Sequence, residues 1–239
     1  MTSVSLSDLR VDLNKITEAL TQETKIIFIS NPNNPTGSVL SKEEMIRFLD
    51  EIPDDIIVAL DEAYIEFISD KSAAQGIELL KGYPLLFVFR TFSKLYGLAG
   101  LRIGYGFASE KIIDYMNRVR QPFNANTLAQ AAAIAALEDT AFVSRTLKVI
   151  RDGIAYLYRE LEDMGLTCIS TQTNFFLIKV PKGGNETYEL MLREGVIIRS
   201  MDSYGLPGYI RINVGLQEEN KRFIKTLKKV LRQQDYLGG

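Results

Sequence analysis

The residue best placed for covalent chemistry in this sequence is Lys94, which ends the polar turn Thr91-Phe92-Ser93-Lys94 after the apolar run Leu85–Phe89. Such a run is typical of a strand buried on both faces in a parallel sheet, and the carboxyl ends of these strands are where open α/β sheets bind ligands. Near buried structure, loss of hydration favours a neutral amine that can attack a carbonyl carbon. The alternative is an ordinary lysine whose amine extends into solvent.

A cation that suits phosphate follows the lysine. Arg102 lies eight residues beyond Lys94, between Gly100 and Gly104. A planar guanidinium donates two parallel hydrogen bonds to a phosphate, and glycines let the backbone approach a bound group closely. The sequence contains neither a Gly-Lys-Ser/Thr loop nor a complete G-x-G-x-x-G fingerprint, so a nucleotide-binding interpretation is weak.

A carboxylate occupies the corresponding position after another apolar run. Asp61-Glu62-Ala63-Tyr64 follows Ile56–Leu60, as the lysine turn follows its own strand. Neighbouring parallel strands end at the same edge of a sheet, so Asp61 and Lys94 are expected to face one crevice. Capping of the following helix is the alternative role for Asp61.

A third polar segment, Asn31-Pro32-Asn33-Asn34-Pro35-Thr36-Gly37, follows the β-rich run 25–30. Two prolines fix φ and the glycine permits a positive φ, so the loop is expected to be rigid and its asparagine amides to be held in defined directions. Plain turn chemistry explains the prolines and the glycine, but it does not require three asparagines.

Composition excludes several classes of function. The net charge of −2 and the isoelectric point near 5.5 give no basic face for nucleic acid. Cys168 is the single cysteine and histidine is absent, which excludes an internal disulfide, histidine-based triads and most zinc chemistry, so no metal site is expected. No run of 18 or so apolar residues and no signal peptide is present, so no membrane partner is expected and the cytoplasm is the default location.

The alternation of strand, helix and strand from Ile26 to Phe89 predicts a right-handed, mostly parallel α/β unit. Its expected helices lie within 6–20, capped by Ser7 or Asp8, from a capping box at Ser41 to about residue 51, and at 69–80, 110–118 and 127–137. A long helix at 141–164 is followed by strands at 173–180, 195–201 and 209–214 and helices at 186–194 and 217–232. This second pattern predicts a small α+β domain.

These motifs, in this order and spacing, resemble the fold-type I, pyridoxal-phosphate-dependent aminotransferases, and among them the histidinol-phosphate aminotransferases. The resemblance rests on the segments Ser30–Gly37, Asp61–Tyr64, Thr91–Lys94, Gly100–Gly104 and Tyr209–Gly215. It implies a three-layer, PLP-transferase-like large domain, N-terminally incomplete, over residues 1–140. A linking helix at 141–165 and a small α+β domain at 166–239 complete the expected organisation.

The resemblance also implies a role for each site residue. Lys94 corresponds to the lysine that bonds covalently to pyridoxal phosphate, and Asp61 to the partner of the pyridine nitrogen. Asn34 and Tyr64 correspond to the hydrogen-bond partners of the ring 3-oxygen, with Asn34 also next to the substrate. The implied phosphate ligands are Thr91, Ser93 and Arg102, and the implied substrate ligands are Arg211, which grips an acidic group, and Arg199, which assists with a phosphate.

The implied activity is amino transfer between histidinol phosphate and 2-oxoglutarate in histidine biosynthesis, carried out by a homodimer when the protein is complete. Another class I/II aminotransferase and a phosphothreonine decarboxylase are alternatives, because the motifs report cofactor chemistry more than substrate. Family members carry roughly a hundred or more residues ahead of the point where this chain begins, including a glycine-rich phosphate loop. A non-catalytic remnant that binds a partner or a ligand is therefore the alternative of a different class.

Overall fold

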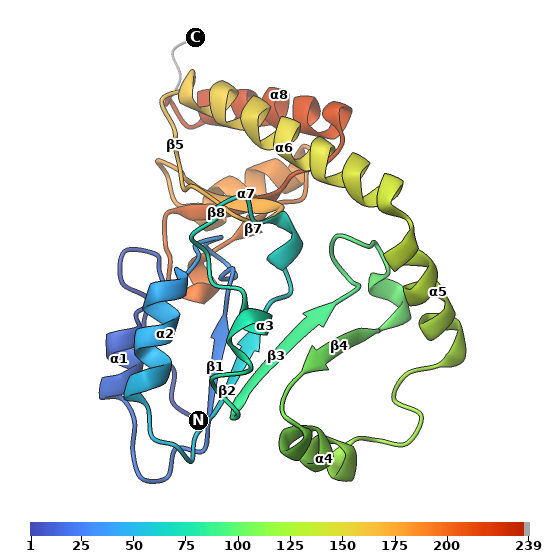
Figure 1. Cartoon of the computed structure of the whole chain (residues 1–239). Coiled ribbons are helices and arrows are strands. Elements are labelled where there is room, and N and C mark those ends of the chain that lie inside the picture. The colour runs from blue at the N-terminus through green and yellow to red at the C-terminus, as the bar shows by residue number, and fades with distance from the viewer. Residues whose placement is uncertain (237–239) are drawn as a thin grey trace. The chain divides into compact units, whose positions relative to one another are not determined.

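The computed structural model describes residues 1–236, which form two compact units (Figure 1). The first unit comprises residues 1–34 and 38–143, and the second comprises residues 35–37 and the chain from 144 onward. The chain therefore passes between the units three times, at 34/35, 37/38 and 143/144. No helix within residues 1–236 has both the length and the apolar character that a membrane crossing requires.

The first unit is built on a sheet with the strand order β1-β2-β3-β4. Its strands are β1 (Ile26–Ser30), β2 (Ile57–Asp61), β3 (Leu86–Thr91) and β4 (Gly104–Phe107). β1, β2 and β3 run parallel, with Ser30 opposite Asp61 and Asp61 opposite Phe89, while β4 pairs antiparallel with β3. The mostly parallel sheet is thus confirmed, and the carboxyl ends of β2 and β3 lie side by side.

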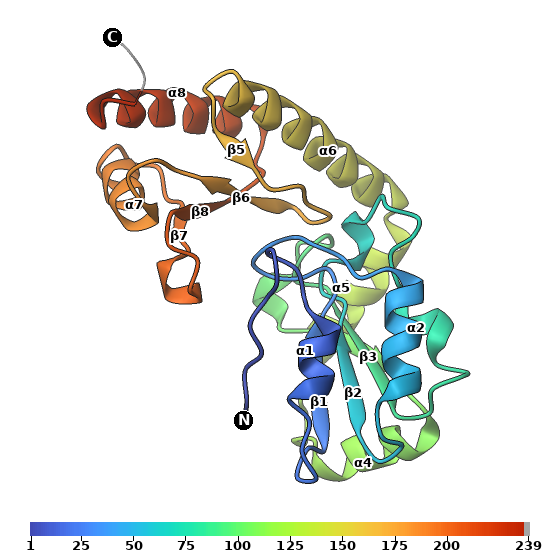
Figure 2. The ribbon, with the colours of Figure 1, turned by 90° about the vertical axis from the view of Figure 1, so that its left-hand side faces the viewer.

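The hydrophobic core of this unit lies on one face of the sheet. Ile29, Leu60 and Val88 pack there against Met45 and Phe48 of the helix α2 (Lys42–Glu51), which lies along that face in Figure 2. Because side chains alternate across a strand, the residues between these core positions point to the other face. That face is less covered.

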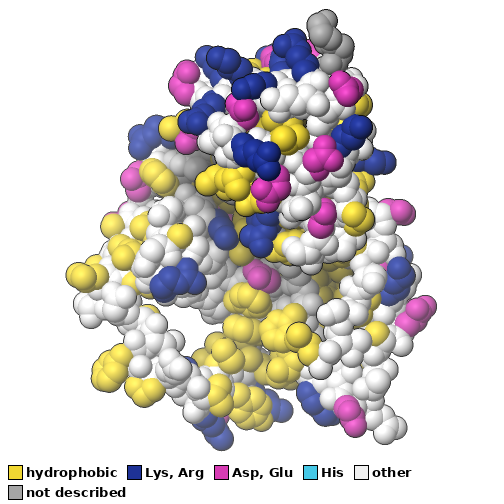
Figure 3. Space-filling model, turned by 180° about the vertical axis from the view of Figure 1, so that it is seen from behind, with side chains coloured by type: hydrophobic (Ala, Val, Ile, Leu, Met, Phe, Trp, Pro, Cys, Tyr) yellow, Lys and Arg dark blue, Asp and Glu magenta, His cyan; other side chains and the backbone are white. Residues whose placement is uncertain are grey.

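The prediction that these strands are buried on both faces is wrong for the face opposite the core. Phe28 of β1 is 72% exposed, and Phe87 and Phe89 of β3 are half-buried. Figure 3 shows apolar side chains gathered on the molecular surface.

The helical segments of this unit are α1 (Leu13–Glu18), α2, the 3-10 turn η1 (Ile65–Phe67), α3 (Gly76–Leu79), the 3-10 turn η2 (Ala99–Leu101), α4 (Glu110–Val119) and α5 (Thr127–Glu138). The predicted capping box is confirmed. Ser41 Oγ accepts from the Glu44 backbone N at 3.1 Å, and Glu44 Oε2 accepts from the Ser41 backbone N at 2.7 Å.

Two predicted helices are shorter than expected. The first begins at Leu13 and is capped by Asp12, not by Ser7 or Asp8. Asp8 has a left-handed φ of 48°, and the Ser7 hydroxyl instead donates to the Asp12 carboxylate at 2.6 Å, so the chain turns before the helix starts.

The helix predicted at 69–80 is reduced to the four residues of α3. Asp70 Oδ1 accepts from the Ser72 backbone N at 2.9 Å, and Ala73 forms an isolated bridge with Ser41. These local hydrogen bonds compete with helix formation in the first half of the segment.

The second unit contains a sheet with the strand order β5-β6-β8-β7, in which every pair is antiparallel. Its elements are α6 (Thr140–Glu162), which begins in the first unit, β5 (Thr167–Cys168), β6 (Phe175–Lys179), α7 (Gly184–Arg193), β7 (Arg199–Ser200), the 3-10 turn η3 (Asp202–Tyr204), β8 (Tyr209–Asn213) and α8 (Gln217–Gln233). The Lys228 ammonium contacts the Glu160 carboxylate at 3.0 Å and ties α8 to α6, which lie side by side in Figures 1 and 2.

The predicted pattern of the second unit is confirmed in order and type, with differences at the edges. β7 spans two residues where 195–201 was predicted, because it forms the edge of the sheet and pairs on one side. β5 is an additional short strand at Cys168. α6 ends as expected before Gly165, whose φ of 72° is left-handed.

Candidate functional site

Asp61 closes β2 with its carboxylate held at the end of the parallel sheet. Its Oδ1 accepts from the Ala63 backbone N at 2.9 Å. Burial raises the pKa of the Asp61 carboxyl, while the hydrogen bond from Ala63 and the charge of Lys94 act in the opposite direction. The next helical turn, η1, begins at Ile65 without any side-chain cap, so Asp61 does not cap it.

Lys94 extends from the turn after β3 toward the segment after β2. Its Nζ lies 5.1 Å from the centre of the Tyr64 ring. Lys94 is exposed, although Phe92 and Leu95 on either side of it and Tyr64 are buried. The structure therefore brings the lysine and tyrosine motifs together at one sheet edge, with the amine accessible.

Hydroxyl and guanidinium donors surround the same turn. Thr91 Oγ1 accepts from the Ser93 backbone N at 3.0 Å, and Arg102 Nη1 lies 3.5 Å from Ser93 Oγ. Arg102 also donates to the Ala99 carbonyl at 2.9 Å from a left-handed backbone with a φ of 53°. Two hydroxyls next to an exposed guanidinium form a donor set that suits an anion with several oxygens.

The asparagines of the loop 31–37 differ in burial. Asn31 is buried, where its Oδ1 accepts from the Leu40 backbone N at 2.8 Å and its Nδ2 donates to the Ala74 carbonyl at 3.3 Å. Asn33 is also buried, whereas Asn34 is exposed at the boundary of the first unit. The hydrogen bonds of Asn31 thus anchor the loop.

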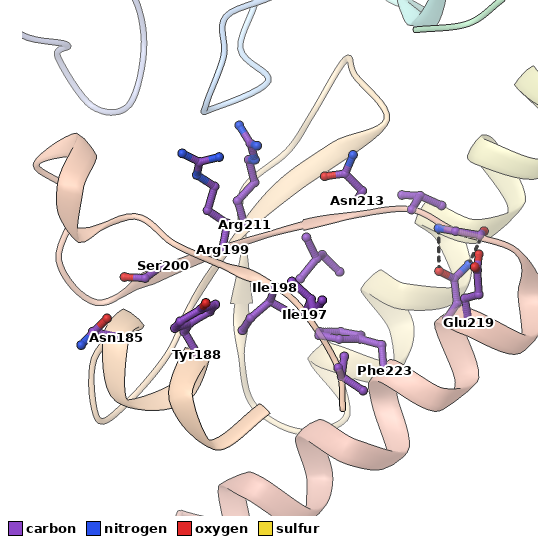
Figure 4. A pocket seen from close by; sticks show the side chains of 15 residues that line it. Asn185, Tyr188, Ile197, Ile198, Arg199, Ser200, Arg211, Asn213, Glu219 and Phe223 are labelled. Carbon is purple, nitrogen blue, oxygen red and sulfur yellow. Dashed lines mark hydrogen bonds between the residues drawn. The ribbon is translucent and has the colours of Figure 1, made fainter. Parts of the chain in front are cut away.

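A second cluster lies in the second unit, where two arginines face the same side of the sheet. Arg199 of β7 and Arg211 of β8 are direct Cα partners, and their side chains extend side by side in Figure 4. Arg211 lies 4.8 Å above the Phe175 ring, and Arg199 lies 5.3 Å from the Tyr204 ring. Like charges directly opposite each other on a sheet repel, so an anion between them is favoured.

The arginines line a pocket of about 730 Å³, within the usual size of small-molecule sites. The other polar residues that line it are Asn185, Tyr188, Ser200, Asn213, Glu219 and Asn220. Glu219 is engaged in capping α8, since its Oε2 accepts from the Leu216 backbone N at 2.6 Å. Arg199 and Arg211 are the positively charged residues of this lining, and their guanidinium groups extend away from Tyr188, Ile198 and Phe223 in Figure 4.

Comparison with known proteins identifies the family of this chain. The sequence profile described as aminotransferase class I and II matches residues 2–227. The chain belongs to this family.

The class I and II aminotransferases similar to this chain include histidinol-phosphate aminotransferase 1 of Idiomarina loihiensis, which is 46% identical over 219 residues, or 92% of this chain. Histidinol-phosphate aminotransferase of Desulfotalea psychrophila is 44% identical over 98% of the chain. The chain spans 60% and 62% of the lengths of these two relatives.

A solved aminotransferase structure has the same fold. Histidinol-phosphate aminotransferase of Sinorhizobium meliloti, in complex with pyridoxal-5'-phosphate, superposes with a TM-score of 0.88 at 30% identity. The match covers 98% of this chain and 65% of that one. The expected PLP-transferase architecture is thereby confirmed.

Two charged residues beside the site were not among the predicted site residues. Glu62 and Arg90 form an ion pair behind the ends of β2 and β3, with a nitrogen to oxygen distance of 2.8 Å. The sequence did carry a signal for them, since each is a charged residue at the end of an apolar strand. Their pairing depends on the register of the two strands, which sequence alone does not supply.

Proposed function

We propose that this chain forms part of a pyridoxal-phosphate-dependent aminotransferase that moves an amino group between histidinol phosphate and 2-oxoglutarate, a step of histidine biosynthesis. The observation that carries the proposal is the placement of Lys94 over Tyr64, with Asp61 at the end of the neighbouring strand. The similarity to histidinol-phosphate aminotransferases supports the choice of substrate.

The residues present fit the cofactor. Arg102 with the hydroxyls of Thr91 and Ser93 suits a phosphate dianion. The Asp61 carboxylate suits a protonated pyridine nitrogen, and Tyr64 and Asn34 are assigned to the ring oxygen. These assignments place the acidic and the basic partners of the cofactor at one sheet edge.

Pyridoxal phosphate, when bound, supplies an aldehyde that exchanges amino groups and a ring that accepts the electron pair released at the substrate Cα. The accessible amine of Lys94 would hold the cofactor covalently, and as a free base it would move the proton at the substrate Cα. Asp61 would keep a proton on the ring nitrogen, because a partly buried carboxylate favours the adjacent positive charge.

Arg211 and Arg199 are assigned to the anionic end of the substrate. A planar guanidinium binds carboxylate or phosphate through two parallel hydrogen bonds. The direct pairing of the two residues across β7 and β8 supports a substrate with more than one negative charge, such as a phosphate monoester. The amino donor and the 2-oxo acid would bind this cluster in turn.

An assay of two reactions tests the proposal. The purified chain is incubated with pyridoxal phosphate, histidinol phosphate and 2-oxoglutarate, and glutamate formation is measured. In parallel, release of carbon dioxide from O-phosphothreonine is measured. We expect glutamate without carbon dioxide. Carbon dioxide release alone would favour the decarboxylase, and cofactor binding without either product would favour a non-catalytic binding protein.

We further propose that the protein acts in the cytoplasm as a homodimer. Exposed apolar side chains on β1 and around α4 and α5 support association with another protein surface. They include Phe28 at 72%, Val119 at 78%, Phe123 at 96% and Leu128 at 78% exposure. Sedimentation equilibrium tests this proposal, since a mass of one chain at micromolar concentration would contradict the dimer.

A further inference from the structure

A buried ion pair lies at the carboxyl ends of β2 and β3, on the face opposite Asp61. Glu62 is fully buried, and the Arg90 side chain is 16% exposed. Glu62 Oε2 accepts from Arg90 Nε at 2.8 Å and lies 2.8 Å from Arg90 Nη2. Glu62 Oε1 accepts from the Gly76 backbone N at 2.6 Å. Both carboxylate oxygens are thus engaged.

The pair connects the two segments that carry the proposed cofactor ligands. Glu62 follows Asp61 directly, and Arg90 directly precedes Thr91. The Glu62 backbone N also donates to the Phe89 carbonyl at 2.9 Å, which extends the strand ladder beyond the end of β2. Because side chains alternate in these strands, the ion pair fixes the backbone from behind while Asp61 and Thr91 face the other side.

The surroundings hold the pair firmly. A Cβ added to Gly76 would meet the Val88 side chain at 2.6 Å and the Leu60 side chain at 2.8 Å, so α3 begins in close contact with the sheet. On the far side, the Arg90 guanidinium lies 5.8 Å from the ring centre of Phe107 in β4. The pair therefore joins β2, β3, β4 and the start of α3.

Global stability alone does not explain charges at these positions. Leu60 and Val88 precede the pair on the same face and are fully buried apolar residues. Replacing a buried ion pair by apolar side chains is often neutral or stabilising, whereas a pair with defined hydrogen bonds specifies one arrangement of its elements.

We propose that Glu62 and Arg90 are positioning residues, which hold the ends of β2 and β3 in one arrangement and so keep Tyr64 and Asp61 at a fixed separation from Lys94. Their importance for the reaction rests on the proposed function. The separation itself is a property of the chain without cofactor. The distance of 5.1 Å from Lys94 Nζ to the Tyr64 ring centre is its direct reporter.

Nuclear magnetic resonance of lysines dimethylated with ¹³C-formaldehyde reads this separation. The Lys94 signal is identified by its loss in Lys94→Arg. In the parent chain, the ring current of Tyr64 should displace that signal, and Tyr64→Leu should abolish the displacement. This pair of spectra calibrates the measurement without any cofactor.

The test variant is the double substitution Glu62→Gln with Arg90→Leu, which keeps an acceptor for the Gly76 N–H and removes both charges of the pair. The matched control is Leu86→Ala, a core change at the opposite end of β3. We expect the double variant to lose at least half of the Lys94 displacement while still unfolding cooperatively, and the control to keep it. A folded double variant with the parent's Lys94 signal would overturn the proposal. If the double variant fails to fold, the Lys94 displacement is measured in Glu62→Gln alone, and the same two outcomes support or overturn the proposal.

A second measurement separates this inference from the proposed function. Each chain is titrated with pyridoxal phosphate, and the fraction of Lys94 bearing a borohydride-reduced adduct is determined by peptide mapping. The double variant should need more than about fivefold more cofactor than Leu86→Ala for half labelling. If the parent shows no Lys94 adduct but the resonance responds as described, the proposed function fails and the positioning role stands. Equal labelling of the double variant and the control would contradict the role in cofactor binding.

Discussion

The Lys94 ammonium lies over the ring of Tyr64, with Nζ 5.1 Å from the ring centre. The two residues are separated by thirty positions in the sequence and by the whole of β3. Their meeting follows from the parallel pairing of β2 and β3, which ends both strands at one edge of the sheet. The proposed cofactor site depends on this relationship.

Replacement of Asp61 by asparagine should impair cofactor binding while leaving the fold intact. Burial raises the pKa of Asp61, so its contribution to stability falls as the pH rises from near 3.8 through the raised value. The amide cannot ionise but can still accept from the Ala63 N–H. At neutral pH we expect Asp61→Asn to unfold at the parent's temperature or above it, and to bind pyridoxal phosphate at least about tenfold more weakly.

Thermal unfolding at several pH values and a cofactor titration check this prediction together. The parent should lose stability relative to Asp61→Asn as the pH is raised from about 4. Unchanged cofactor affinity in the variant would mean that Asp61 does not hold the pyridine nitrogen.

Replacement of Arg211 by lysine should weaken substrate binding and leave cofactor binding unaffected. Lysine keeps the charge but cannot reproduce the planar, two-donor contact of a guanidinium. Loss of one charge-assisted pair in a closed site costs roughly 2 to 5 kcal/mol, so histidinol phosphate should bind more than about tenfold more weakly.

Isothermal titration of histidinol phosphate into the parent, Arg211→Lys and Arg193→Lys measures the effect. Arg193 is an exposed arginine in the last turn of α7 and serves as the matched control. Equal affinity in all three chains would remove Arg211 from the substrate site.

The Cys168 thiol should make the protein sensitive to alkali. Burial, aided by the charge of Glu162, raises the pKa of Cys168 from an ordinary 9.0 to about 12. The folded chain keeps the thiol proton after the unfolded chain has lost it, so stability falls as the pH rises from about 9 toward about 12. Cys168→Ala should reduce the fall in unfolding temperature between about pH 8 and about pH 10.5. An identical fall in both chains would contradict the raised pKa.

The strands and the positions of the polar residues at their ends were predictable because they depend on local pattern. The apolar runs before Asp61 and Lys94 indicate buried strands, and parallel pairing then places the two residues at one edge. The capping box at Ser41 is likewise a short-range signal, and the structure has the helix it predicts.

The features that escaped prediction depend on register or on competing local contacts. Arg199 and Arg211 become direct neighbours only through the antiparallel pairing of β7 with β8. The pairing of Glu62 with Arg90 requires knowledge of which face each side chain occupies. The helix predicted at 69–80 was shortened by hydrogen bonds between Asp70 and Ser72, which pattern counting does not weigh.

The most direct test of the account is the identity of the lysine that binds the cofactor. The purified chain is incubated with pyridoxal phosphate, reduced with borohydride and digested, and the modified peptides are sequenced by mass spectrometry, with Lys94→Arg as the control. We predict a pyridoxyl adduct on Lys94 that forms at the lowest cofactor concentrations and is absent from the control. Adducts confined to other lysines, at equal levels in both chains, would contradict it.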